Sequence, residues 1–163
     1  MNEDQYLTFQ LKGKGYGLPI HVVREIIGYE TPDIVPMMPE WMKGIINLRG
    51  HGVPVIDLAI RFYNSETTIT NHSCIVIFNA GTAEDEKLMG LIVDSVSEVI
   101  LFSNEMIEAP PETGTGQKAD FLVGVGKLEN KFYLLLNIRT TLEYVSKMDL
   151  SETLESIEEM SAK

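Results

Sequence analysis

The side chains that could carry out chemistry are few and widely separated along this sequence. The three histidines, His21, His51 and His72, lack the i, i+4 or paired spacing of a metal site. No Gly-x-Ser-x-Gly motif occurs, and the segment 114–118, Gly-Thr-Gly-Gln-Lys, lacks the glycine-to-lysine spacing of a phosphate-binding loop. We therefore predict that the protein is not an enzyme and that it holds no metal ion or cofactor.

Three carboxylates remain as candidates for acid–base chemistry: Asp57, Asp94 and Glu98. Asp57 follows an apolar run and can cap the start of a helix, while Asp94 and Glu98 belong to a segment that is repeated in the chain. A small hydrolase or ligand-binding barrel that uses Asp94 and Glu98 stays open as an alternative. It predicts a polar cavity that contains both carboxylates.

Arg49 is the cation whose surroundings are the most informative. It lies in the segment 44–50, Gly-Ile-Ile-Asn-Leu-Arg-Gly, between an apolar run and glycine-rich chain. One interpretation is a structural salt bridge to Glu25 or Asp57. The other is an arginine that presents its five donors to a binding partner, as interface arginines often do.

The composition excludes several other classes of protein. The chain has 163 residues, of which 44% are hydrophobic, and a net charge of -11. Such an acidic surface repels phosphate backbones and anionic lipids, so we expect no nucleic-acid partner. No window approaches the ~18 apolar residues of a membrane helix, and no signal peptide is visible. We expect a cytoplasmic protein without direct membrane insertion.

An internal repeat organises the chain. Residues 17–27 align with residues 90–100, with five of eleven positions identical, and residues 41–45 and 54–58 align with 121–125 and 134–138. Two related half-chains, at about 5–63 and 72–144, account for this pattern; chance similarity of apolar strands is the alternative. Glu129 aligns with Arg49, so the repeat does not require a cation there.

Each half is expected to be mainly β. Apolar residues alternate with polar ones along residues 6–11, and Gly-Lys-Gly at 13–15 marks a tight turn. Short continuous apolar runs at 75–78 and 88–93 flank an acidic turn at 83–86. A third hairpin is expected near 128–132, with Asn130 in the left-handed turn conformation. Asp57 and Asn137 are expected to cap short helices.

The C-terminal residues 148–163 differ in kind from the rest. Leu150, Leu154, Ile157 and Met160 recur at the spacing of one helix face. Between Asp149 and the last residue there are five acids and one base. We expect an acidic amphipathic helix or tail, separate from a single domain at 1–147 that is made of the two half-repeats.

Three blocks together resemble the CheW family of bacterial chemotaxis adaptors. They are the segments at 16–27, at 44–62 with its Asn-Leu-Arg-Gly sequence, and at 90–99. The resemblance runs from about residue 5 to residue 144. It implies two tandem SH3-like five-stranded β-barrel subdomains with short helices.

The resemblance also implies a non-enzymatic function. The protein would couple the cytoplasmic tips of transmembrane chemoreceptors to the regulatory domain of the histidine kinase CheA, next to membrane-anchored receptor arrays. Kinase-contact residues are not assigned. A coupling protein of the same fold in another receptor–kinase pathway, such as twitching motility, stays open as an alternative. The residues that match the family's receptor-binding positions are Val23, Glu25, Gly44, Arg49, Val96 and Val99.

Overall fold

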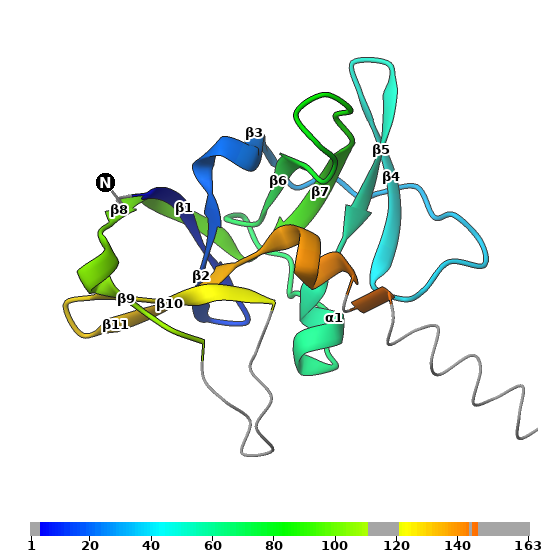
Figure 1. Cartoon of the computed structure of the whole chain (residues 1–163). Helices are drawn as coiled ribbons and strands as arrows, with labels where there is room; N and C mark the ends of the chain where they lie inside the picture. Colours follow the sequence, from blue (N-terminus) through cyan, green and yellow to red (C-terminus); the bar gives the residue numbers. More distant parts are fainter. Residues whose placement is uncertain (1–3, 111–120, 144, 147–163) are drawn as a thin grey trace, which may run out of the picture.

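The computed structural model describes residues 4–110, 121–143, 145 and 146. These residues form two β-sheets in which most strand pairs are antiparallel (Figure 1). One sheet has six strands in the order β8-β1-β2-β11-β10-β9, and the other has five in the order β3-β6-β7-β5-β4. This confirms the expectation of a mainly β fold with two small SH3-like units and short helices, although the units are not closed barrels and one has six strands instead of the expected five. The elements are β1 (Asp4–Leu11), β2 (Lys14–Pro19), β3 (Val23–Gly28), β4 (Met42–Leu48), β5 (His51–Ile56), α1 (Leu58–Tyr63), β6 (Cys74–Asn79), β7 (Leu88–Val93), β8 (Ser95–Phe102), β9 (Ile107–Glu108), β10 (Leu122–Leu128) and β11 (Lys131–Leu136).

Each sheet takes strands from both halves of the chain. Strands β1 and β2 join β8 to β11 in the six-stranded sheet, while β6 and β7 join β3 to β5 in the other (Figure 1). The two strand orders match position by position, since β8 corresponds to β3, β1 to β6, β2 to β7, β11 to β5 and β10 to β4. The repeat seen in the sequence therefore corresponds to two interlocked halves.

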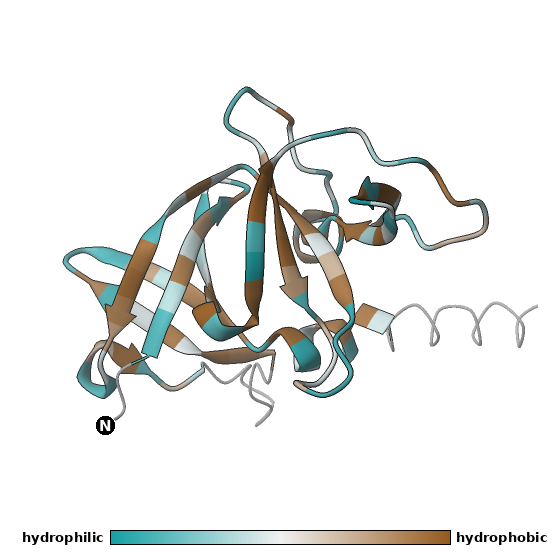
Figure 2. Ribbon diagram, turned by 90° about the horizontal axis from the view of Figure 1, so that it is seen from above, coloured by the Kyte–Doolittle hydropathy of each residue, from teal (hydrophilic) through white to brown (hydrophobic). Residues whose placement is uncertain are grey.

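Three clusters of buried apolar side chains hold this arrangement together. One small cluster lies within the five-stranded sheet and includes Val55 and Ile77, and another lies within the six-stranded sheet and includes Phe102. The largest takes side chains from both sheets, among them Phe9 and Phe78. Figure 2 shows the apolar residues along the strands. The two units thus share one large core, and each also has a small cluster of its own.

The position of β6 in its sheet explains why its sequence is continuously apolar. Ile75 and Ile77 point into the five-stranded sheet's own cluster, whereas Val76 and Phe78 point into the shared core. Since successive side chains of a strand face opposite sides, a strand buried on both faces must be apolar at every position. The run at 75–78 therefore reflects this central position.

The two expected helix caps are present and equivalent. The Asp57 side chain accepts a hydrogen bond from the Ala59 N–H at 3.1 Å, and the Asn137 side chain accepts one from the Thr140 N–H at 3.1 Å. A helix over residues 138–143, which continues at 145 and 146, follows Asn137 and corresponds to α1. Both caps satisfy N–H groups that have no partner within the helix.

One sequence prediction about a turn is wrong, and another lies outside the described residues. Glu129, at φ 58°, takes the left-handed conformation in the β10–β11 turn that was expected of Asn130. The strand pairing leaves Glu129 and Asn130 as the two turn residues, so Glu129 occupies the first turn position. A left-handed residue at that position fits the twist of the flanking strands. The expected amphipathic helix at 148–163 lies outside the described residues.

The connection between α1 and β6, residues 64–73, is anchored on Asp57. The Thr67 N–H and its hydroxyl donate to the two Asp57 carboxylate oxygens, both at 2.8 Å, and Asp57 is 1% exposed. Glu66 in the same connection forms an ion pair with Lys43 at 2.9 Å. The connection therefore covers the carboxylate that caps α1.

Replacing Thr67 with valine is expected to lower the free energy of unfolding by about 1.5 kcal/mol, because it removes a buried hydrogen bond to a charged group. Urea unfolding measures the change. The matched control is Thr68→Val, because the Thr68 side chain is exposed and its neighbour's anchoring bonds stay in place. Equal destabilisation by the two substitutions would contradict the assignment.

Candidate functional site

The central feature of the candidate site is an exposed ion pair between Arg49 and Glu25. The Arg49 Nη2 atom lies 2.6 Å from Glu25 Oε1, and Nη1 lies 3.4 Å from Oε2. Arg49 is in the two-residue β4–β5 turn at φ 50°, followed by Gly50 at φ 87°. Glu25 lies on β3, an edge strand of the same sheet, and β4 is the opposite edge. The pair therefore joins the two edges of the five-stranded sheet.

The ion pair shifts both pKa values toward the charged forms. The hydrogen bond from Arg49 lowers the pKa of Glu25, partly offset by desolvation, and the hydrogen bond to Glu25 raises the pKa of Arg49. The Arg49 side chain is 71% exposed, so solvent screens the attraction. The pair is well suited to orient the guanidinium and contributes little to stability.

Replacing Arg49 with alanine is expected to raise the pKa of Glu25 toward its ordinary value. Because the folded-state pKa of Glu25 lies below that of the unfolded chain, the contribution of the pair to stability is present at neutral pH. It fades as the pH falls through the folded-state pKa. Carboxylate NMR titration of Glu25 in both proteins measures this. An unchanged Glu25 pKa in the variant would show that the pair does not form in solution.

The corresponding place in the other sheet holds no such pair. The equivalents of Glu25 and Arg49 are Glu98 on β8 and Glu129 in the β10–β11 turn. Two acids cannot form an ion pair, and the main chain at Glu98 instead exchanges hydrogen bonds with the Thr8 hydroxyl, at 2.6 Å and 3.2 Å. The cation is therefore specific to one of the two units, and the fold does not require it.

Gly44 allows two chain segments to approach closely. Its φ is 142°, and a Cβ at this position would overlap the carbonyl oxygen of Asp33. Asp33 and Ile45 form a bridge here through two backbone hydrogen bonds, at 2.8 Å and 2.9 Å. Gly124 is the equivalent residue, and a Cβ there would meet the carbonyl of Glu108. Gly44 thus positions the connection that precedes β4.

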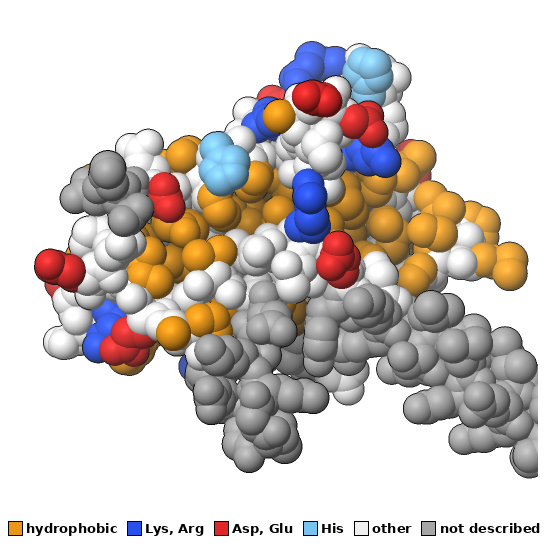
Figure 3. Space-filling model, in the orientation of Figure 1, with side chains coloured by type: hydrophobic (Ala, Val, Ile, Leu, Met, Phe, Trp, Pro, Cys, Tyr) orange, Lys and Arg blue, Asp and Glu red, His pale blue; other side chains and the backbone are white. Residues whose placement is uncertain are grey.

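The apolar candidates lie on β3 and β8, which are edge strands of different sheets. Val23 and Val96 are equivalent residues, and both are half-buried against the shared core. Val99 on β8, a predicted site residue, is 47% exposed. Its equivalent on β3 is Ile26, which is 43% exposed and was not predicted. Ile26 follows Val23 at the same spacing as Val99 follows Val96, and this match could have identified it. Figure 3 shows hydrophobic side chains across one face, below charged ones near the β4–β5 and β6–β7 turns.

Two of the three candidate carboxylates, Asp57 and Asp94, have structural contacts. Asp94 Oδ2 accepts a hydrogen bond from the Gly13 N–H at 2.9 Å, which ties the β1–β2 turn to the start of β8, and Asp57 caps α1. Asp94 and Glu98 are not brought together in one of the described cavities. Within residues 4–110, 121–143, 145 and 146, no three His, Cys, Asp or Glu side chains group in a way that could hold a metal ion.

The described helices are also too short and too polar to cross a bilayer. An exposed ion pair and two edge strands with exposed apolar side chains are features of a protein-binding surface. Comparison with known proteins specifies the class. The model of the CheW-like domain family matches residues 5–145.

The relatives agree with this match. The chain is 31% identical over 138 residues to a Chemotaxis protein CheW of Klebsiella aerogenes, covering 85% of this chain and 81% of that protein. It is 34% identical over 144 residues to the Chemotaxis protein CheW of Treponema pallidum, with 85% and 82% covered. A solved structure of the scaffolding protein TtCheW from Thermoanaerobacter tengcongensis aligns with a TM-score of 0.71 at 34% identity, covering 84% of this chain and 86% of that one.

The chain therefore belongs to the CheW-like domain family. It is a non-enzymatic chemotaxis scaffold, as its family and its relatives' names indicate.

Proposed function

We propose that this protein couples the cytoplasmic tips of chemoreceptors to the regulatory domain of the histidine kinase CheA, beside membrane-anchored receptor arrays. The observation that carries this proposal is the exposed Arg49–Glu25 pair on a CheW-like scaffold, next to an edge strand with half-exposed apolar side chains. An arginine held in a fixed orientation beside apolar surface is typical of protein interfaces.

The receptor-binding residues in this proposal are Val23, Glu25, Arg49, Val96 and Val99, with Gly44 holding the backbone beside them. A chemoreceptor tip is a helical hairpin, and a helix binds by laying apolar side chains along a groove or strand edge. The exposed Val99 and the half-buried Val23 and Val96 supply apolar contacts of this kind. Arg49 supplies directional hydrogen bonds at one end.

Replacing Val99 with aspartate is expected to weaken binding to a soluble receptor fragment about tenfold, because a charge would enter an apolar contact. Val99 is preferable to the half-buried Val96 for this test, since Val99→Asp places the new charge in solvent and leaves the core intact. Titration calorimetry measures the affinity. The control is Phe132→Asp, which adds the same charge at a side chain that is 61% exposed in the β10–β11 hairpin.

Unchanged affinity in a folded Val99→Asp variant would remove β8 from the receptor site. The functional proposal itself is tested by capture from a lysate that contains receptors and kinase, with the full chain as bait. Recovery of both a chemoreceptor and CheA supports it, whereas recovery of neither contradicts it.

A further inference from the structure

A cavity lies where the start of β2 and the start of β11 meet the end of α1. It has a volume of about 610 Å³, within the range of about 300–1,000 Å³ that is typical of small-molecule sites. The aromatic side chains Tyr63, Phe132 and Tyr133 line it, and so do Lys14 and Lys131. Among the described residues, the lining therefore contains two cations and no acid, in a chain whose net charge is -11.

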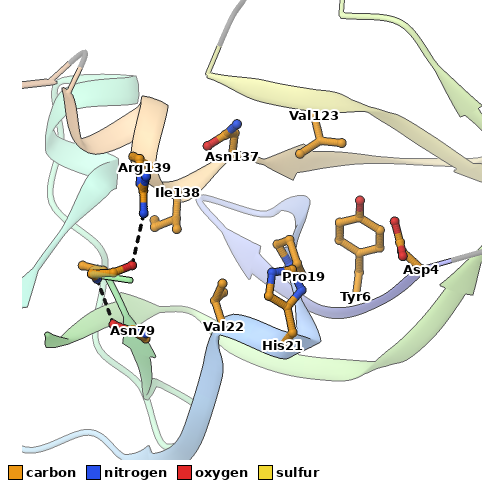
Figure 4. Close-up of a pocket in the computed structure, with 12 residues that line it drawn as sticks. Asp4, Tyr6, Pro19, His21, Val22, Asn79, Val123, Asn137, Ile138 and Arg139 are labelled. Atoms are coloured by element: carbon orange, nitrogen blue, oxygen red, sulfur yellow. Dashed lines mark hydrogen bonds between the residues drawn. The ribbon is translucent and has the colours of Figure 1, made fainter. Parts of the chain in front are cut away.

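The other described cavities differ from this one because each contains acids. These acids are Asp4 in the cleft shown in Figure 4, Asp57 and Glu66 beside Lys43, and Asp94 beside Lys12. A carboxylate in the lining repels an anionic ligand and weakens the attraction of a neighbouring cation. The cavity between β2 and β11 is therefore the one whose charge suits an anion.

The parallel pairing of β2 with β11 places the two lysines at the same end of the sheet. Leu134 pairs with Tyr16, and two positions before them the strands carry Phe132 and Lys14, with Lys131 just ahead of Phe132. Neighbouring strands lie about 4.8 Å apart. Neither lysine forms an ion pair within residues 4–110, 121–143, 145 and 146, whereas five other cations there do: Arg24, Lys43, Arg49, Lys87 and Lys127. The two ammonium groups are thus available to a ligand.

The aromatic walls of the cavity are held by contacts with the chain around them. The Tyr63 hydroxyl shares a hydrogen bond of 2.5 Å with the hydroxyl of the buried Tyr16. A Cβ at Gly15 would lie 3.0 Å from Tyr133 Cδ1 and 3.1 Å from the Phe132 carbonyl oxygen, so the glycine lets β2 pack closely against β11. Phe132 is 61% exposed and Tyr63 is 37% exposed, which leaves ring surface for a ligand to contact.

The fold itself does not require these aromatic residues. In the other half of the repeat, Gly52 aligns with Phe132 and Glu143 aligns with Tyr63. The equivalent place therefore lacks both exposed rings and has an acid in addition. The combination of lysines and aromatic rings is specific to one half, as the cation at Arg49 is to the other.

We propose that this cavity binds a small aromatic anion, a planar ring joined to a phosphate group as in a nucleoside monophosphate. Lys14 and Lys131 bind the phosphate as point charges, and together they match its charge of about -2 at neutral pH. The ring stacks on Phe132 or Tyr63, a contact that every nucleobase can make. The net charge of -11 opposes a nucleic-acid polymer, but a local pair of cations still attracts a single phosphate group.

This cavity shares no residue with the proposed receptor-binding set, so the inference does not depend on the proposed function. Titration of the full chain with adenosine monophosphate, followed by amide NMR spectra, tests it. We expect saturable shifts for residues 13–15 and 131–134, and none for residues 79–81, which line the cleft in Figure 4. The absence of saturable shifts, or shifts grouped at residues 79–81 instead, would overturn the proposal.

Two fragments of the probe separate the contributions of the ring and the phosphate. Adenosine and inorganic phosphate should each bind at least about tenfold more weakly than adenosine monophosphate, because each lacks one of the two groups that the cavity contacts. Equal affinity for adenosine would mean that the lysines are not used, and equal affinity for phosphate would mean that the rings are not. Either result contradicts the proposal.

Single substitutions test the assigned residues against a matched control. Lys14→Gln, Lys131→Gln and Phe132→Ala should each weaken binding of adenosine monophosphate about tenfold. Lys87→Gln removes the same charge at the position that aligns with Lys14, and it should leave the affinity unchanged. All four side chains are exposed, so the variants keep the fold. Equal weakening in all four would indicate nonspecific attraction, and unchanged affinity in the first three would remove the ligand from this cavity.

Discussion

Replacing Gly44 with alanine is expected to lower the free energy of unfolding by about 4 kcal/mol. Two causes add. Alanine is strained at φ 142°, and its Cβ would overlap the backbone carbonyl of Asp33, which cannot rotate away as a side chain could. Relief requires that the Asp33–Ile45 bridge opens, with the loss of two backbone hydrogen bonds. Chemical unfolding by urea, followed by circular dichroism, measures the change.

Two other glycines separate these causes. Gly50→Ala keeps the unfavourable backbone, at φ 87°, but a Cβ there meets no heavy atom within 4 Å, so a loss of about 1 kcal/mol is expected. Gly28→Ala has open space and no positive φ, and we expect a change within about 0.5 kcal/mol. A Gly44→Ala protein as stable as the Gly28→Ala protein would contradict the close approach at Asp33.

Local patterns predicted strands, the places of turns and the caps, though not the left-handed residue of the β10–β11 turn, because these depend on residues close together in sequence. The alternation along residues 6–11 and the apolar run at 75–78 became β1 and β6, and Asp57 and Asn137 cap helices as expected. The internal repeat also predicted two similar units. All of these depend on short-range geometry and burial.

The pairing of strands from different halves could not be predicted in the same way. A repeat of strands at 17–27 and 90–100 is equally consistent with two consecutive sheets and with two interlocked ones. The choice depends on the parallel contacts of β2 with β11 and of β5 with β7, which join residues far apart in sequence. No local pattern encodes those contacts.

For the candidate site, the sequence left two interpretations of Arg49, and the structure contains the ion pair that one of them describes. Pairing with Glu25 does not exclude contact with a partner, because the guanidinium remains 71% exposed. The pair uses part of the five donors of the side chain and leaves the others available. A test must therefore separate stability from binding.

Exchanging the two charges makes that separation. Arg49→Glu alone is expected to weaken binding to a receptor fragment about 30-fold or more, because it places an acid where the partner meets a cation and leaves two carboxylates side by side. The unfolding free energy should change little, since both side chains are solvent-screened. The double variant Arg49→Glu with Glu25→Arg restores an ion pair with its polarity reversed.

The binding affinity of the double variant distinguishes a structural role of the ion pair from direct contact between Arg49 and the partner. If the ion pair serves only to join the two edges of the sheet, the exchange should restore binding together with the pair. If the partner contacts the guanidinium itself, the pair forms again but binding does not recover, because the cation now lies on β3 instead of at the β4–β5 turn. We expect the second result. Full recovery of affinity in the exchanged protein would assign Arg49 to the structure alone and move the receptor site elsewhere on the scaffold.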